Sequence, residues 1–294
     1  MALTNRVFTL LFILISYTNL NAKMVEQFFI KISPNQELVN CGKLKVSKTK
    51  TSFDYFIKDN KVNIISPEDA LEWINDSIQK KYPPDSKILF FIHGFWGSLP
   101  FATHRTAKEF AKSYFKKEDS KTVAIIHIVW DANDLNYKNS IVELENSSLT
   151  LSNIFNSIST KIKCKHSLMC HSMGNRFLHE TLSKQTINVK FEKLILMAPD
   201  LDYRKYESNF NLFSDLAKAV AVFFHTKDKT LKMSSKINKI ERLGRLNKSD
   251  IAKNIQFIDC SAIRDINSLS DSVMKHLYFL TSDSVKQQIN EFIK

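Results

Sequence analysis

The sequence predicts a single α/β domain built on a mostly parallel, doubly wound sheet with antiparallel strands at its N-terminal edge. From residue 87 onward, short apolar runs alternate with segments whose apolar residues recur at helical spacing. Continuous apolar runs are typical of parallel strands that are buried on both faces. The 294 residues can bury a large core, and no linker, repeat or low-complexity segment divides them. We therefore expect residues 23–294 to form one domain.

The first part of this domain has strand character. β-branched and aromatic residues predict short antiparallel strands at the edge of the sheet, at 25–32, 44–47, 53–57 and 62–65. Ser66-Pro67 then opens a helix, because serine is a favoured N-cap and proline fits the first helical turn. Pro83-Pro84 ends that helix.

The rest of the chain alternates between the two kinds of element. Besides the run that leads to Cys170, strands are predicted at 87–92, 122–129, 191–197, 220–225 and 254–259. Helices are predicted at 101–115, 140–162, 175–183, 212–219, 232–243 and 285–293. Since ligands bind at the carboxyl ends of parallel strands, the residues that follow each strand are the candidates for a site.

One of these strand ends reads Cys170-His171-Ser172-Met173-Gly174 and leads into a helical segment. A strand, a tight turn and a helix with a serine at the apex fit the pattern Gly-x-Ser-x-Gly, whose turn exposes the serine Oγ above a sheet. Small residues flank such a serine because the strand and helix backbones nearly touch. Cys170 stands in place of the first glycine and is small enough to fit. Ser172 is therefore a candidate nucleophile, and the alternative is an ordinary serine at a strand–helix junction.

Other strand ends supply an acid and a base in the chain order serine, acid, histidine. His276 follows the last predicted strand and is the candidate base, with an isolated surface histidine as the alternative. Asp228, after the strand at 220–225, is the preferred acid, although it lies between two lysines and a solvated turn carboxylate competes. Asp202 and Asp200, after the preceding strand, are the alternative acids.

Together these motifs resemble the α/β-hydrolase-fold serine hydrolases over residues 87–279. The chain is most similar to a little-characterised bacterial branch with His-Gly-Phe, a Trp before a Tyr-containing helix start, His-Ser-Met-Gly-Asn, Ala-Pro-Asp and a late His. The counterparts here are His93-Gly94-Phe95, Trp130 with Tyr137, residues 171–175, Ala198-Pro199-Asp200 and His276. The resemblance implies a three-layer α/β-hydrolase fold and a Ser-Asp-His triad that forms an acyl-enzyme.

The resemblance also implies an oxyanion hole made by the backbone N–H groups of Phe95 and Met173. Gly94 and Gly97 would let the loop around Phe95 approach the serine. Four larger residues are expected near the site, His93 and His171 beside it and two tryptophans that line an acyl pocket or belong to the core, Trp96 and Trp130. The histidines and cysteines show no metal-ligand spacing, so we expect neither a metal nor another cofactor.

The net charge of +12 comes mainly from lysine, with dense runs at 112–121 and 227–248. These runs predict either contact with an anionic surface, such as phospholipid head groups, or simply solvated helix faces. No zinc-knuckle, RNP or helix-turn-helix pattern occurs, so nucleic acid is not an expected partner.

Residues 1–22 have the pattern of a secretory signal peptide, with Arg6 before an apolar run at 7–17. That run is about half the length of a membrane span, so export after cleavage is expected, with an uncleaved anchor as the alternative. In an exported protein, Cys41–Cys260 or Cys164–Cys260 could pair, whereas Cys170 is expected to be a packed thiol.

The sequence thus predicts an exported, metal-independent serine hydrolase that cleaves a small-molecule or lipid ester through an acyl-enzyme. Two alternatives stay open. One is a peptidase or amidase on the same fold, and the other is a catalytically silent scaffold that binds a partner or an anionic surface.

Overall fold

The computed structural model describes residues 25–44, 63–97, 100–114, 121–132, 136–246 and 253–294. The predicted signal peptide, the predicted strand at 53–57 and nearly all of that at 44–47 lie outside these ranges. Within them, no helix is both long enough and apolar enough to cross a membrane.

Nine strands form one sheet in the described part of the chain: β1 (Glu26–Ile32), β2 (Val39–Lys43), β3 (Asn63–Ile65), β4 (Lys87–Ile92), β5 (Thr122–Trp130), β6 (Lys165–His171), β7 (Phe191–Met197), β8 (Ala217–Phe224) and β9 (Ile255–Asp259). Their order is β3-β2-β1-β5-β4-β6-β7-β8-β9. β1 runs parallel to β5, and β4 to β9 continue the parallel sheet. Among the described strands, the antiparallel pairs are β1 with β2 and β2 with β3. The predicted sheet is confirmed, but the first strand belongs to its parallel part.

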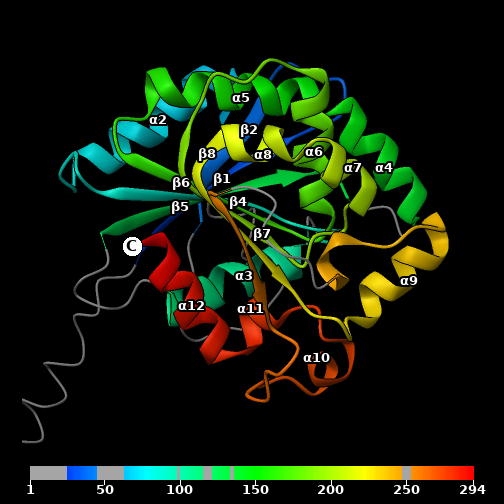
Figure 1. Cartoon of the computed structure of the whole chain (residues 1–294). Helices are drawn as coiled ribbons and strands as arrows, with labels where there is room; N and C mark the ends of the chain where they lie inside the picture. Colours follow the sequence, from blue (N-terminus) through cyan, green and yellow to red (C-terminus); the bar gives the residue numbers. More distant parts are fainter. Residues whose placement is uncertain (1–24, 45–62, 98–99, 115–120, 133–135, 247–252) are drawn as a thin grey trace, which may run out of the picture.

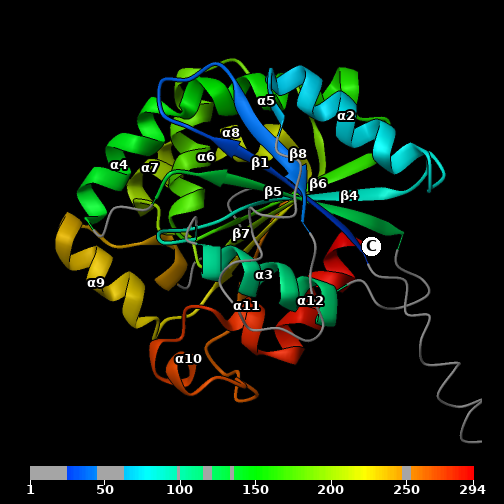
Figure 2. The same cartoon turned by 180° about the vertical axis from the view of Figure 1, so that it is seen from behind.

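Helices cover both faces of this sheet (Figures 1 and 2). One face carries α2 (Pro67–Gln79), α4 (Tyr137–Asn146), α5 (Ser148–Lys161), α6 (Met173–Lys184), α7 (Tyr203–Ser208) and α8 (Phe210–Leu216). The other carries α3 (Pro100–Ser113), α10 (Leu269–Met274), α11 (Tyr278–Thr281) and α12 (Asp283–Ile293). Figure 1 shows α9 (Lys229–Asn238) at the right, beyond the carboxyl end of β8.

The central strands bury side chains on both faces, which explains their continuous apolar runs. In β4, Phe90 and Ile92 join the core under α5 and α6, whereas Leu89 and Phe91 join the core under α3 and α12. Successive side chains of a strand point to opposite faces, so one apolar run serves two cores.

The boundaries of several helices differ from the prediction. α2 begins as expected, since the Ser66 hydroxyl accepts a hydrogen bond from the Asp69 N–H at 3.1 Å. The predicted helix at 140–162 is two helices, α4 and α5, that meet at Ser147. The predicted helix at 212–219 ends at Leu216, because residues 217–219 belong to β8 and pair with β7.

The prediction for α9 was shifted along the chain. The structure has this helix at 229–238 rather than at 232–243. It begins where the Asp228 carboxylate caps the Leu231 N–H, and it ends where Lys239 takes the left-handed conformation, with φ 55°. Three helices of four to six residues, α7, α10 and α11, were not predicted because they are too short to show a helical period.

Candidate active site

Ser172 lies on the turn between β6 and α6, in a strained backbone conformation with φ 52° and ψ −122°. Such a conformation persists only where the surroundings fix it. The Ser172 N–H donates to the Met197 carbonyl at 3.0 Å, and the Ser172 carbonyl accepts from the Asp200 N–H at 3.1 Å and from Asn175 Nδ2 at 3.0 Å. The turn is therefore held on both sides by the neighbouring strand end and by the helix that follows.

The glycines next to the turn are required by close packing rather than by their dihedral angles. A Cβ on Gly174 would lie 2.7 Å from the carbonyl oxygens of both Ile92 and His93, and a Cβ on Gly94 would lie 2.7 Å from Ser172 Cβ. The positive φ values of this region belong instead to Ser172, Trp96 and Ala198. Cys170 replaces the first glycine of the motif without difficulty, because its side chain is fully buried in the core.

The structure brings Ser172, His276 and Asp228 into one hydrogen-bonded line. His276 Nε2 lies 2.9 Å from Ser172 Oγ, and His276 Nδ1 lies 2.7 Å from Asp228 Oδ2. A carboxylate can only accept, so Nδ1 carries the proton and Nε2 is left to accept from the serine hydroxyl. All three side chains are buried, and Asp228 is wholly inaccessible to solvent.

The environment favours the protonated form of His276. Burial alone would lower the pKa of this imidazole, but the negative charge of Asp228 and the hydrogen bond to it outweigh burial and raise the pKa above 6.5. The ring can therefore hold a proton while the Asp228 carboxylate stays beside it. That is the property a general base needs at the moment it has taken up a proton.

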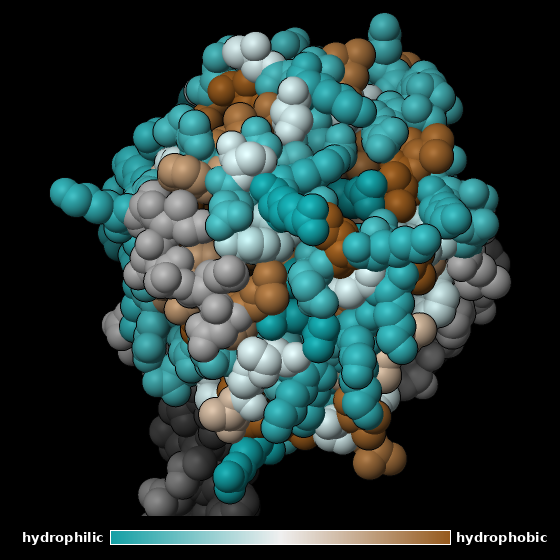
Figure 3. All heavy atoms as spheres, turned by 45° about the vertical axis from the view of Figure 1, so that its right-hand side comes forward, coloured by the Kyte–Doolittle hydropathy of each residue, from teal (hydrophilic) through white to brown (hydrophobic). Residues whose placement is uncertain are grey.

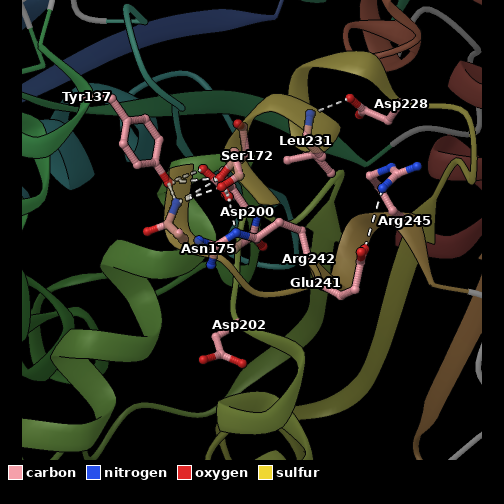
Figure 4. Close-up of polar contacts among 12 residues, drawn as sticks. Tyr137, Ser172, Asn175, Asp200, Asp202, Asp228, Leu231, Glu241, Arg242 and Arg245 are labelled. Atoms are coloured by element: carbon pink, nitrogen blue, oxygen red, sulfur yellow. Dashed lines mark hydrogen bonds and ion pairs between the residues drawn. The ribbon is translucent and has the colours of Figure 1, made fainter. Parts of the chain in front are cut away.

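Asp200 and Asp202, the alternative acids, have other partners. Asp200 accepts hydrogen bonds from Tyr137 Oη at 2.8 Å and Ser234 Oγ at 2.5 Å, and its Oδ1 lies 3.2 Å from Nε of the buried Arg242. The Asp202 carboxylate caps α7 through the Arg204 N–H at 2.8 Å. Figure 4 shows Asp200 within this cluster, while Asp202 lies farther from Ser172 and Asp228 lies beside Leu231. Of the three carboxylates, Asp228 is the one that contacts His276.

A fourth carboxylate, Asp271 in α10, was missed by the sequence analysis. Its Oδ1 accepts from the backbone N–H groups of His276 at 2.8 Å and Leu277 at 2.6 Å, and its Oδ2 accepts from Thr281 Oγ1 at 2.6 Å. Asp271 is buried and fixes the loop that carries His276. The pattern Ser268-x-x-Asp271, in which Ser268 Oγ caps the Asp271 N–H, is the local signal that could have identified this helix start.

His93 and Trp130 support the site from the core. The two rings stack with centroids 5.5 Å apart and an interplanar angle of 4°. His93 Nδ1 donates to the Gly94 carbonyl at 2.7 Å, and His93 Nε2 accepts from the Trp130 N–H at 3.2 Å. Burial lowers the pKa of His93 to about 4, so the ring is neutral. Of the two alternatives for Trp130, the structure places it in the core, whereas Trp96 is 45% exposed.

His171 lies beside His276. Its ring centroid is 4.8 Å from that of His276 and 4.6 Å from that of Phe279, and its Nε2 donates to the His276 carbonyl at 3.3 Å. Burial and the neighbouring His276 hold the pKa of His171 well below 6.5. A neutral His171 therefore packs against His276 without adding a second positive charge.

The backbone N–H groups of Met173 and Phe95 belong to the two segments that follow β6 and β4. Met173 is the first residue of α6, and the first N–H groups of a helix have no partner within the helix. Phe95 follows Gly94 in a turn that the Gly97 N–H closes by donating to the Gly94 carbonyl at 2.9 Å. These two N–H groups are the ones predicted from the sequence to form an oxyanion hole.

The described residues contain no group of three or more His, Cys, Asp or Glu side chains that could hold a metal ion. Cys164 and Cys260 are buried free thiols, so neither of the two conceivable disulfides is present.

Comparison with curated proteins finds no match. Solved structures similar to the chain include MenH from S. aureus, at 11% identity and a TM-score of 0.37, with 70% of this chain and 93% of that chain covered. An esterase from Pyrococcus furiosus is similar at 11% identity and a TM-score of 0.38, with 93% and 92% covered. The peroxisomal α/β-hydrolase Lpx1 from Saccharomyces cerevisiae is similar at 11% identity and a TM-score of 0.35, with 87% and 86% covered.

A family model described as "Alpha/beta hydrolase of unknown function (DUF900)" matches residues 66–291, which include all strands from β4 to β9 and all of the candidate site residues. The protein is therefore a member of this α/β-hydrolase family.

Proposed function

We propose that this α/β-hydrolase is a serine hydrolase that cleaves carboxylic esters through an acyl-enzyme. The single observation that carries the proposal is the hydrogen-bonded line from Asp228 through His276 to Ser172, with the serine on a strained turn. A serine hydroxyl is a weak nucleophile until a neighbouring base removes its proton. Here the base already lies 2.9 Å from the hydroxyl, with its second nitrogen fixed by a carboxylate.

In the first half of the reaction, Ser172 Oγ attacks the carbonyl carbon of the ester while its proton passes to His276 Nε2. Asp228 keeps His276 in the tautomer with the proton on Nδ1 and stabilises the imidazolium that forms. The carbonyl oxygen becomes an oxyanion and accepts hydrogen bonds from the N–H groups of Met173 and Phe95. The intermediate collapses, His276 returns the proton to the departing alcohol oxygen, and an acyl-Ser172 ester remains.

In the second half, His276 Nε2 takes a proton from a water molecule, whose oxygen attacks the acyl carbonyl. The same two N–H groups hold the oxyanion, and the Ser172 Oγ leaves with the proton that His276 gives back. Ester and amide substrates pass through these same steps. We favour esters because an alcohol is the better leaving group, and because exposed apolar side chains and lysines gather on helices next to the site.

The test is the hydrolysis of p-nitrophenyl esters of rising acyl-chain length, with a matched anilide in parallel. We expect a rapid release of p-nitrophenol on mixing, which marks acyl-enzyme formation, and a preference for the ester. Ser172→Ala should lower kcat/KM by about 10⁴-fold or more. The matched control is Ser157→Ala, which removes a buried serine whose Oγ donates to the Asn153 carbonyl of its own helix, away from the triad.

Two results separate the proposal from its rivals. Faster hydrolysis of the anilide than of the ester would assign the protein to the amidases. Equal rates for the wild type and Ser172→Ala would contradict the proposal and leave a scaffold that binds without catalysis.

A further inference from the structure

The helices α9 and α10 lie next to the candidate site, and both are exposed on the molecular surface. α9 begins directly after Asp228, which caps it, and α10 ends at Met274, so that its C-cap residue Lys275 is followed directly by His276. The two helices contact each other, and Figure 1 shows them side by side at the right and lower right. Whatever binds to their outer surface is therefore held next to Asp228 and His276.

Both helices expose apolar side chains in pairs four residues apart, so that each pair lies on one side of its helix. On α9, Met233 is 58% exposed and Ile237 is 49% exposed. On α10, Leu269 is 89% exposed and Val273 is 51% exposed. Single exposed apolar residues are common on proteins, but two pairs on adjacent helices beside a candidate active site indicate a binding surface.

The same surface of α9 is strongly basic. Lys229, Lys232 and Lys236 are exposed, and the helix contains no acidic residue. Asp228, just before it, is buried against His276 and does not neutralise them. In the described part of the chain, no ion pair engages these three lysines.

A cavity of about 620 Å³ adjoins the lysines between α7, α9 and the short helix η2 (Leu243–Arg245). It is lined by five cationic side chains, Arg204, Lys232, Lys236, Lys239 and Arg245. Its acidic residue, Glu241, lies 3.4 Å from Arg245 and is thereby paired. The hollow therefore has the charge that suits a phosphate-bearing head group.

The arrangement of the apolar residues favours a membrane over a protein partner. On the face that Figure 3 turns toward the reader, brown apolar residues lie as separate spots among teal hydrophilic ones. A protein interface usually has a continuous apolar centre. Apolar side chains next to lysines on one helix are instead typical of segments that lie in the interface of a bilayer, where the lysines meet lipid phosphates.

We propose that the docking face, defined as Lys229, Lys232, Met233, Lys236, Ile237, Leu269 and Val273, binds a bilayer that contains anionic phospholipids. Its apolar side chains enter the boundary between head groups and acyl chains, and its lysines contact the lipid phosphates. Docking holds Asp228, His276 and Ser172 close to lipids in that bilayer, so the substrate class is a lipid ester. The substrate part of this inference rests on the proposed hydrolase function, whereas the binding part does not.

Binding is measured first, by flotation with vesicles of phosphatidylcholine and phosphatidylglycerol in a ratio of about three to one, and with vesicles of phosphatidylcholine alone. The full chain carrying Ser172→Ala is used, so that no lipid is consumed. We expect strong binding to the anionic vesicles and at least about tenfold weaker binding to the neutral ones. Every protein compared carries the same residues 1–24, so differences between variants come from the substituted side chains.

The charge is tested with the variant Lys229→Gln/Lys232→Gln/Lys236→Gln, which should bind the anionic vesicles at least about tenfold more weakly. Its matched control removes three exposed lysines at the amino ends of β6 and β7, away from the carboxyl ends where the site lies, namely Lys163→Gln/Lys165→Gln/Lys190→Gln. The control changes the net charge equally and should bind as the parent does. Equal weakening by both variants would overturn the docking face, since binding would then follow net charge alone.

The apolar contribution is tested with Met233→Ser/Ile237→Ser, and its control is Leu38→Ser/Ile64→Ser, two exposed residues at the far side of the sheet near β2 and β3. The first variant should lose binding at least about fivefold and the second should not. No vesicle binding by the parent protein, or equal binding by all variants, would overturn the inference. Thermal unfolding measures the stability of each variant. Because all four substituted residues are exposed, we expect the melting temperature to stay unchanged.

Measurements of ester hydrolysis then test whether membrane binding delivers substrate to Ser172. In a chain with Ser172 intact, Met233→Ser/Ile237→Ser should slow the cleavage of an ester embedded in anionic vesicles and leave the cleavage of a soluble short-chain ester unchanged. An active enzyme that cleaves the soluble ester but binds no vesicles would keep the proposed function and refute the docking face. Vesicle binding without any hydrolysis would refute the lipid-ester substrate and keep the docking face.

Discussion

The carboxylate of Asp271 accepts a hydrogen bond from the backbone N–H of His276 at 2.8 Å, five residues farther along the chain. The same oxygen accepts from the Leu277 N–H. One buried carboxylate therefore fixes two successive peptide groups at His276, the histidine of the proposed triad. His276 thus depends on Asp228 for the tautomer of its ring and on Asp271 for the place of its backbone. Asp228 therefore acts on His276 through its charge, whereas Asp271 acts by holding the His276 backbone in position.

Asp271→Ala should lower kcat by about 100-fold, because a displacement of about 1 Å at a catalytic group can cost that much. The KM for a soluble ester should change little, since Asp271 does not face the substrate. Steady-state kinetics with a p-nitrophenyl ester measure both constants.

Asp271→Asn is the control that separates position from charge. Its amide oxygen still accepts from His276 and Leu277, and its amide nitrogen can donate to Thr281 Oγ1 while that hydroxyl donates to the Leu277 carbonyl, 3.1 Å away. We expect activity near that of the wild type. A loss as large as that of Asp271→Ala would contradict the positioning role.

Asp228→Asn should lower kcat/KM by about 10³- to 10⁴-fold without unfolding the protein, because an amide at this place favours the wrong tautomer of His276. Asp202→Asn should change the rate little, since this carboxylate caps α7 and does not contact the base. Kinetics of the two variants side by side identify the acid. A larger loss in Asp202→Asn than in Asp228→Asn would contradict the assignment.

The pH dependence of kcat/KM should report the raised pKa of His276. Asp228 stabilises the protonated ring, so the pKa lies above the 6.5 of an unperturbed histidine. The base acts in its neutral form, so activity should rise with pH through a midpoint above 6.5. In Asp228→Asn the charge is gone while burial remains, and the midpoint of the residual activity should move to lower pH. A midpoint that stays in place would show that Asp228 does not set this pKa.

Arg242 should matter for stability more than for chemistry. It is 2% exposed, and its Nε lies 3.2 Å from Asp200 Oδ1. Arg242→Met leaves Asp200 buried without a counter-charge and should lower the free energy of unfolding by about 3–5 kcal/mol. The double variant Asp200→Asn/Arg242→Met should recover much of that loss. Urea denaturation measures both, and a double variant less stable than Arg242→Met would contradict the pairing.

Much of the site could be predicted from the sequence, because its residues are marked by a short local motif or by their order along the chain. Ser172 is marked by the residues on either side of it, and Asp228 and His276 by their positions after predicted strands. The structure brings these three side chains together, while their catalytic role stays a prediction. On the sequence alone, Asp228 is the preferred acid, and Asp202 and Asp200 stay as alternatives. The contact that distinguishes Asp228 depends on where His276 lies in the fold, which the sequence does not show.

Other features depend on contacts between distant segments. Ala217 and Ala219 extend an apolar helical pattern and favour a helix by propensity, but pairing with β7 makes them part of a strand. β1 reads as an edge strand, yet it lies parallel to β5, which is about a hundred residues away. Asp271 acts through backbone N–H groups, and such contacts leave no pattern in the sequence beyond the cap of a short helix.

The central claim is that Ser172 is an activated nucleophile. The most direct measurement is the reaction of the folded protein with a fluorophosphonate, followed by mass spectrometry to locate the adduct. We predict one adduct per chain, on Ser172, which is absent in Ser172→Ala and forms far more slowly in His276→Ala. A folded wild-type protein that forms no adduct, or forms it on another residue, would contradict the account.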